Sequence, residues 1–152
     1  MRPITLKFLK ASNNAILPKK NYPTDACFDL YYPLNKEPLF IPSHEQVLVD
    51  TELSCIIPEH CWIKFHERSG LAYRKGIKVS AGVIDQAYTG RLKVLLLNTS
   101  DTAQIIDSGT AICQFSIEEV RPCEIAEINL DDFKNEESVR SRKAKGFGSS
   151  GV

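Results

Sequence analysis

Apolar residues recur at every second position along much of this chain. The alternation is clearest over residues 4–8, 47–57 and 113–117, where polar side chains fill most of the positions between. Such spacing puts apolar side chains on one face of a β-strand. The helical spacing of 3.6 residues is nearly absent, and proline, glycine and asparagine separate the runs at short intervals. The pattern predicts an all-β fold, a jelly-roll-like barrel or sandwich.

Residues 77–84 and 91–98 are predicted to form two strands joined by a turn. The first segment alternates throughout. The second becomes apolar on both faces at residues 95–97, which is typical of a strand buried on both sides.

Asp85 lies where the first of these strands ends, and Tyr88 lies in the connection. A carboxylate at a strand end can be held rigidly and still reach a ligand. Gly82 and Gly90 would let the backbone approach a flat base at an open hairpin tip. The alternative is that Asp85 caps a turn, Tyr88 packs and the glycines adopt positive φ.

The strand pattern stops at about Leu130. We therefore expect one β domain over residues 1–130 and a flexible C-terminal arm over 131–152. The arm begins with an acidic stretch and ends in "RSRKAKGFGSSGV", where four basic residues precede a phenylalanine between two glycines.

Composition is that of an ordinary globular protein: 152 residues, 43% hydrophobic and 25% charged. The formal net charge of zero predicts no general affinity for nucleic acid or for a membrane surface, so an anion site must use local charge. No apolar run approaches the roughly 18 residues of a membrane span, and the first residues do not resemble a secretion signal. Five cysteines without a CxxC pair predict reduced thiols in an intracellular protein, cytoplasmic or nuclear.

Three other short segments carry candidate chemistry. Arg68, Ser69 and Gly70 offer a guanidinium, a hydroxyl and backbone N–H groups, which together can bind phosphate. Asp29 follows Asp25 by four residues, and a carboxylate pair can hold hydrated Mg²⁺. Gln114 lies on the polar face of its predicted strand. Taken singly, a helix capped by Ser69, acidic turn residues and a solvated glutamine explain these segments as well.

The conjunction of these segments is more specific than any one of them. In chain order the sequence contains "DACFDL", "RSGLA", "AGVIDQAYTG", "GTAICQ" and "RKAKGFGSSG". In this order and spacing they resemble the five motifs of the trimeric dUTP diphosphatases (dUTPases), and the resemblance covers residues 25–152. It implies a homotrimer with active sites shared between subunits, which uses Mg²⁺ to hydrolyse dUTP to dUMP and diphosphate.

The resemblance also implies a role for individual residues. Asp85 matches the aspartate that activates the attacking water. Tyr88 matches the tyrosine that packs on deoxyribose, and Asp29 the aspartate that holds Mg²⁺ through water. The other implied substrate-binding residues are Gly82 and the backbone near Lys93 for uracil, Arg68, Ser69, Gly70 and Gln114 for phosphates, and Arg142, Phe147, Gly148 and Ser149 for closing the arm over the nucleotide.

The chain departs from the family pattern at several positions. Lys143 and Lys145 stand where the tail usually has glycine, and His66-Glu67 stands where Ala-Pro usually precedes the Arg-Ser-Gly segment. Two alternatives stay open on the sequence. One is a dCTP deaminase-related enzyme, although the chain lacks a Ser-Ser-x-Ala-Arg segment. The other is a nucleotide-binding regulatory trimer with a protein partner.

Overall fold

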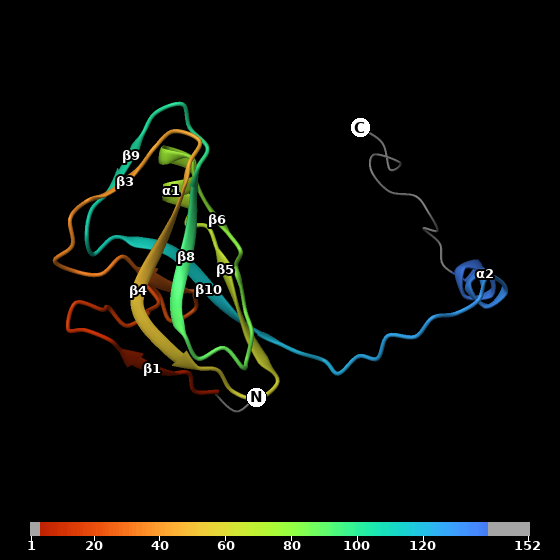
Figure 1. Ribbon diagram of the computed structural model, residues 1–152. Helices are drawn as coiled ribbons and strands as arrows, with labels where there is room; N and C mark the ends of the chain where they lie inside the picture. Colours follow the sequence, from red (N-terminus) through yellow and green to blue (C-terminus); the bar gives the residue numbers. More distant parts are fainter. Residues whose placement is uncertain (1–3, 140–152) are drawn as a thin grey trace. The chain divides into compact units, whose positions relative to one another are not determined.

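The computed structural model describes residues 4–139. The chain divides into two units, Met1–Arg121 and Pro122–Val152. The first unit contains every strand found in residues 4–139: a four-stranded sheet of order β1-β4-β8-β6, a second of order β2-β10-β5-β7, and the small pair β3-β9 (Figure 1). The predicted jelly-roll-like, all-β class is confirmed. No helix in residues 4–139 is long and apolar enough to cross a membrane.

The elements have the following bounds: β1 Lys7–Lys10, β2 Phe28–Tyr31, β3 Leu39–Ile41, β4 Gln46–Ile56, β5 Cys61–His66, α1 Ser69–Lys75, β6 Ile77–Ser80, β7 Val83–Ile84, β8 Arg91–Asn98, β9 Gln104–Ile106, β10 Ala111–Glu119 and α2 Leu130–Ser138. All strand pairs within the sheets are antiparallel.

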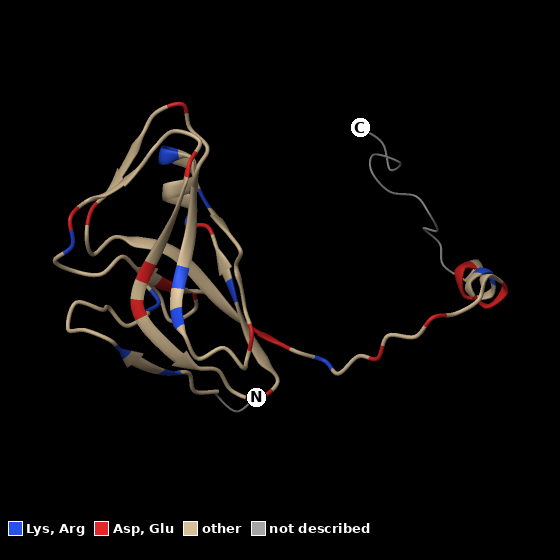
Figure 2. Ribbon diagram, viewed as in Figure 1, with Lys and Arg blue, Asp and Glu red and all other residues tan. Residues whose placement is uncertain are grey.

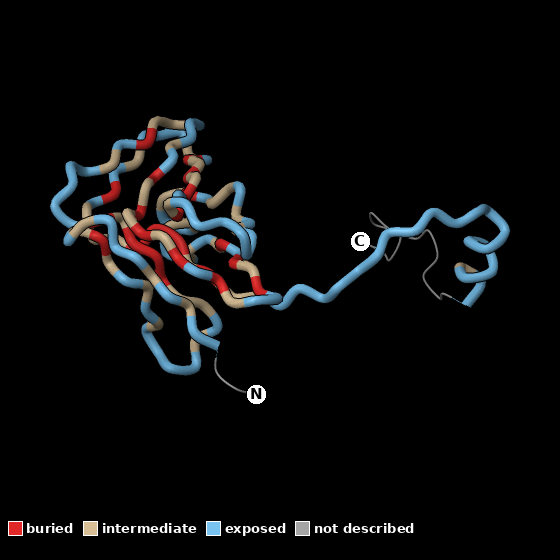
Figure 3. Tube along the Cα trace, turned by 60° about the horizontal axis from the view of Figure 1, so that its bottom comes forward, coloured by how far each residue is buried: buried red, intermediate tan, exposed pale blue. Residues whose placement is uncertain are grey.

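The core lies between the two four-stranded sheets. Alternate residues of β4, among them Val49, Leu53 and Cys55, are buried as their spacing predicts, and Leu92, Val94 and Leu96 of β8 join them. The opposing sheet contributes Ile63 and Phe65 of β5 with Cys113 and Phe115 of β10. Figure 3 shows the buried stretches gathered within the first unit. Burial of these apolar side chains is the main stabilising contribution, at about 25 cal/mol per Å².

The prediction of a single strand over residues 77–84 is wrong, because this segment forms two strands, β6 and β7. β6 ends at Ser80, and Ala81 has a left-handed backbone with φ of 52°. The chain then enters the opposite sheet as β7, where Val83 and Ile84 pair with Lys64 and Ile63 of β5. The alternating pattern continues through this change of sheet, so periodicity alone does not reveal it.

The second strand of the predicted hairpin is confirmed as β8, but it is not buried on both sides. Leu96 and Asn98 are fully buried, whereas Leu95 and Leu97 on the other face are only half-buried. Three apolar residues in succession therefore do not place β8 in the centre of the core.

Residues 4–139 contain two short helices, α1 between β5 and β6 and α2 after the last strand. In α1 the N-cap residue is Arg68 and no side chain caps the helix, so the alternative of a Ser69 cap is excluded. In α2 the side chain of Asn129 accepts a hydrogen bond from the N–H of Asp132, and Asp131 and Asp132 lie in the first turn. Carboxylates there complement the helix dipole. The sequence pattern did not predict α2, which lies in the second unit.

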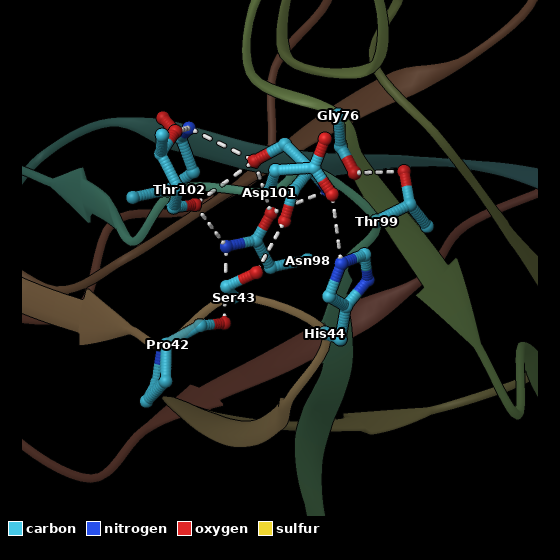
Figure 4. A network of polar contacts seen from close by, with 10 residues as sticks. Pro42, Ser43, His44, Gly76, Asn98, Thr99, Asp101 and Thr102 are labelled. Atoms are coloured by element: carbon cyan, nitrogen blue, oxygen red, sulfur yellow. Dashed lines mark hydrogen bonds and ion pairs between the residues drawn. The ribbon is translucent and has the colours of Figure 1, made fainter.

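A buried asparagine fixes the end of β8 (Figure 4). The Asn98 amide donates to the carbonyls of Ile41, Pro42 and Thr102 at 3.1, 3.0 and 2.8 Å. Its Oδ1 accepts hydrogen bonds from the N–H and the hydroxyl of Ser100. One fully buried side chain therefore joins the end of β8 to the corner between β3 and β4.

Asn98→Ala should destabilise the protein by about 3 kcal/mol, because buried carbonyls lose their donors and a cavity remains. The measurement is urea unfolding followed by far-UV circular dichroism. Asn13→Ala, which changes an exposed asparagine, is the matched control and should shift stability by less than about 0.5 kcal/mol. Equal effects of the two substitutions would contradict the role of this network.

Candidate active site

A polar hollow of about 330 Å³ brings several predicted site residues together. It is lined by Asn21, Asp25, Ala26, Cys27, Asp29, Arg68, Ser69 and Gln114. These residues come from β2 and the loop before it, from the start of α1, and from β10. Segments that are far apart in the sequence therefore line one hollow.

Asp29 is the most enclosed charged group of this hollow. Its side chain is 8% exposed, and its Oδ2 lies 3.2 Å from Nη1 of Arg68. The side-chain amide of Asn21 donates to the same oxygen at 3.1 Å. The ion pair holds the guanidinium of Arg68 at the hollow, and it also neutralises a carboxylate that would otherwise repel phosphate.

Gln114 lies on β10, between its paired residues on the two neighbouring strands of the sheet. It pairs in register with Asp29 of β2 on one side and with His66 of β5 on the other. Its side-chain amide donates to the carbonyl of Glu67 at 2.8 Å, which fastens the segment entering α1. The strand register thus sets the positions of Asp29 and Gln114 together.

Cys27 also lines the hollow, beside the two aspartates. Burial, with a smaller contribution from the charge of Glu118, raises the pKa of its thiol. The thiol therefore stays neutral at physiological pH and adds no negative charge.

Asp85 lies in a second hollow, of about 470 Å³. This hollow is lined by Cys61, Trp62, Val83, Asp85, Gln86, Ala87 and Val120. Asp85 is exposed and directly follows β7, so its position depends on the pairing of β7 with β5. The side chain of Gln86 accepts a hydrogen bond from the N–H of His60 at 3.1 Å, which ties this turn to the start of β5.

Tyr88 closes the turn between β7 and β8. Its N–H donates to the carbonyl of Asp85 at 3.0 Å, and its hydroxyl donates to the carbonyl of Arg91 at 2.7 Å. A Cβ placed on Gly90 would lie 2.6 Å from the Tyr88 hydroxyl oxygen, so Gly90 is needed for the ring to lie there. Tyr88, which is predicted to pack on deoxyribose, is therefore held at the edge of the turn and is 43% exposed.

The change of sheet leaves part of β8 without a strand partner on this side. β6 pairs with β8 only from Leu95 to Asn98, and β7 pairs with β5. Among residues 4–139, no strand therefore pairs with residues 91–94 on the edge of β8 that faces β6, although β4 pairs with them on the other edge. Lys93, whose backbone is predicted to contact uracil, lies in this stretch. Its side chain is exposed, and the residue pairs in register with Asp50 of β4.

Gly82 has a clear structural role at the start of this opening. Its carbonyl accepts a hydrogen bond from the N–H of Phe65 at 2.8 Å. A Cβ on Gly82 would lie 2.9 Å from the Phe65 carbonyl oxygen, so only glycine allows the two backbones to approach this closely.

The structure thus sorts the predicted residues into two groups. Asp29, Arg68, Ser69 and Gln114 line the polar hollow, with Gly70 next to them in α1, whereas Asp85 lines the other hollow with Tyr88 and Gly82 nearby. Arg142, Phe147, Gly148 and Ser149 lie outside the described residues. Sequence reasoning missed Asn21 and Cys27. Asn21 reaches the hollow because Lys19 forms an isolated bridge with Asp29.

The comparisons with known proteins identify the class to which this fold and these motifs belong. The dUTPase family matches residues 13–151 of the chain. The chain belongs to the dUTPase family.

Two deoxyuridine 5'-triphosphate nucleotidohydrolases from fungi illustrate the similarity, which extends over nearly the whole chain. The deoxyuridine 5'-triphosphate nucleotidohydrolase of Candida albicans is 38% identical over 147 residues, which cover 97% of this chain and 88% of the relative. The probable deoxyuridine 5'-triphosphate nucleotidohydrolase of Schizosaccharomyces pombe is 39% identical, with 94% and 96% covered.

Solved structures agree with this assignment. A mutant dUTPase of Staphylococcus bacteriophage 80alpha, determined with dUpNHpp, has a TM-score of 0.84 at 26% identity and covers 97% of this chain. The match also covers 99% of the phage protein's chain. A mutant dUTPase from phage phi11 of S. aureus, whose structure describes the coordination of a structural Mg(II) ion, shares the fold with a TM-score of 0.74 at 21% identity, with 82% of this chain and 97% of that one covered.

Gly82→Ala should cost about 2 kcal/mol of stability, because the new methyl group collides with the backbone of β5. Gly70→Ala is the matched control: a Cβ there meets nothing within 4 Å, and alanine in a helix should stabilise by up to about 1 kcal/mol. Chemical unfolding of both variants gives the comparison. A neutral Gly82→Ala would show that the contact with β5 is not required.

Proposed function

We propose that this protein is a dUTP diphosphatase, which hydrolyses dUTP to dUMP and diphosphate. Its membership of the dUTPase family supports the reaction. The observation that carries the residue roles is the gathering of Asp29, Arg68, Ser69 and Gln114 in one polar hollow. An ion-paired arginine, a hydroxyl and an amide are groups that bind phosphate oxygens.

Uracil is read by the backbone of the open hairpin. Along residues 91–94 the carbonyls of Arg91 and Leu92 already accept from the hydroxyls of Tyr88 and Thr51. The remaining N–H and C=O groups of the edge that β6 leaves uncovered can bond to the edge of a pyrimidine. Cytosine presents a different donor and acceptor pattern, and each buried group that it leaves unpaired costs about 1–3 kcal/mol. A narrow hairpin also has no space for the methyl group of thymine.

Tyr88 selects the sugar and Asp85 activates water. The ring of Tyr88, held by its bond to Arg91, packs on the deoxyribose and leaves no room for a 2′-hydroxyl. The carboxylate of Asp85 orients the attacking water and accepts its proton. Hydrolysis of a triphosphate otherwise needs in-line positioning and neutralisation of charge, which Arg68, Ser69, Gly70 and Gln114 supply.

The polar hollow also fits a hydrated Mg²⁺ ion. Among residues 4–139, the side-chain contacts of Asp29 with Asn21 and Arg68 both fall on Oδ2, so Oδ1 can accept a hydrogen bond from a metal-bound water. Asp25 supplies a second carboxylate to the same hollow. The described residues contain no group of three or more His, Cys, Asp or Glu side chains placed to hold a metal ion directly. Such an ion would add positive charge beside the phosphates.

The active site is completed between subunits of a homotrimer. Asp85 and Arg68 line different hollows of one chain. In the shared site, one subunit offers its hairpin and another its polar hollow. The arm, through Arg142, Phe147, Gly148 and Ser149, closes over the nucleotide and excludes bulk water. A closed three-fold ring repeats this shared site three times.

The test is diphosphate release from dUTP, dTTP, dCTP and UTP by the purified protein, with ammonia release from dCTP measured in parallel. Hydrolysis of dUTP should be strongly preferred. Asp85→Asn should lower turnover by at least about 10²-fold while dUTP still binds, because the amide keeps the shape but cannot accept a proton. Near-normal turnover of this variant would remove Asp85 from the mechanism, and ammonia release would assign the deaminase reaction instead.

A further inference from the structure

A third hollow, rich in positive charge, adjoins the polar hollow at Arg68. It measures about 280 Å³ and is lined by Arg68, Gly70, Leu71, Arg74, Lys75, Thr110 and Ala111. Figure 2 shows basic residues at the end of α1, which borders it. Arg68 lines both hollows, so the two are direct neighbours.

The spacing along α1 explains why the cations converge. Leu71, Arg74 and Lys75 follow Arg68 by three, six and seven residues, which places them along one face of the helix. That face lies opposite the start of β10, where Thr110 adds a hydroxyl. The ammonium group of Lys75 donates to the carbonyl of Ile105 at 2.8 Å, so its position is fixed.

Most of the positive charge of this hollow has no acidic partner among the described residues. Its lining contains no aspartate or glutamate. Arg68 is paired with Asp29, but neither Arg74 nor Lys75 forms an ion pair within residues 4–139. Uncompensated cations in a concave site raise the local concentration of anions.

The helix dipole accounts for only part of this arrangement. Basic residues in a last turn generally stabilise the C-terminus of a helix. Here, however, the ammonium group of Lys75 bonds to the carbonyl of Ile105 in β9 rather than to a carbonyl of α1. The carbonyls of Leu71 and Ala72 receive the backbone N–H of Gly76. Arg74 takes part in neither contact, and the ammonium group of Lys75 keeps two of its three N–H groups for a ligand.

We propose that this basic hollow binds inorganic diphosphate, the leaving group of the reaction. The inference rests on the proposed function for the origin of the anion. Attack on the α-phosphorus releases diphosphate beside Arg68, and the same guanidinium borders the basic hollow. Arg74, Lys75 and the Thr110 hydroxyl then hold a compact anion of high charge better than a nucleotide, for which the lining offers no aromatic ring.

The experiment is calorimetric titration of the intact protein with inorganic diphosphate, without nucleotide. Arg74→Gln should weaken binding about tenfold, as expected for loss of one charge-assisted contact. Arg74→Lys should recover most of the affinity. Lys78→Gln, which removes an exposed cation of β6 outside the hollow, is the matched control and should bind diphosphate like the wild type. Thermal unfolding checks that each variant is folded.

Product inhibition provides the second readout. Arg74→Gln should raise the inhibition constant of diphosphate by a similar factor, with kcat for dUTP at low product unchanged. The proposal is wrong if Arg74→Gln and Lys78→Gln bind diphosphate equally well, or if orthophosphate binds as tightly as diphosphate. Arg74-dependent diphosphate binding without dUTP hydrolysis would support this hollow and overturn the proposed function instead.

Discussion

The close approach of Gly82 to Phe65 is the contact on which the candidate site depends. There the chain leaves the sheet of β6 and β8 and joins β5, held by the bond from the Phe65 N–H to the Gly82 carbonyl. This one change of sheet opens the edge of β8 and delivers Asp85 to the surface. Had β6 continued beside β8, the ladder would occupy the backbone groups proposed to read the base.

A second constraint is electrostatic, and it organises the phosphate side of the site. Asp29 is nearly buried and needs a partner, and Arg68 with Asn21 supplies it. That pairing holds the guanidinium where phosphate oxygens can reach it. The adjoining hollow continues the positive charge along α1, so under the proposed function the substrate and the released product would both meet cations.

The sequence predicts most of the β structure, because each strand of the sandwich buries one face and so alternates. It does not predict the break after Ser80, since Ile77, Val79 and Val83 keep their spacing while the chain changes sheets. The cause is a tertiary contact with β5, which local periodicity cannot reveal. The apolar spacing within the nine residues of α2 is too short to indicate a helix, although Asn129 caps it by accepting from the N–H of Asp132.

The order of motifs predicts candidate site residues but not how they are arranged. Arg68, Gln114 and Asp85 were identified through the order of motifs, whereas their division between two hollows follows from strand register and from the sheet change. Asn21 was missed because an unremarkable loop residue gains its role only through the bridge between Lys19 and Asp29.

The most direct test of the shared site uses two inactive proteins, Asp85→Asn and Arg68→Gln. Both are unfolded together in equal amounts and refolded, and mixed trimers are verified by native mass spectrometry. If the hairpin and the polar hollow of one site come from different subunits, random assembly gives about one intact site in four, and dUTP hydrolysis should recover to about a quarter of the wild-type rate. Activity that stays at zero in confirmed mixed trimers would contradict the account.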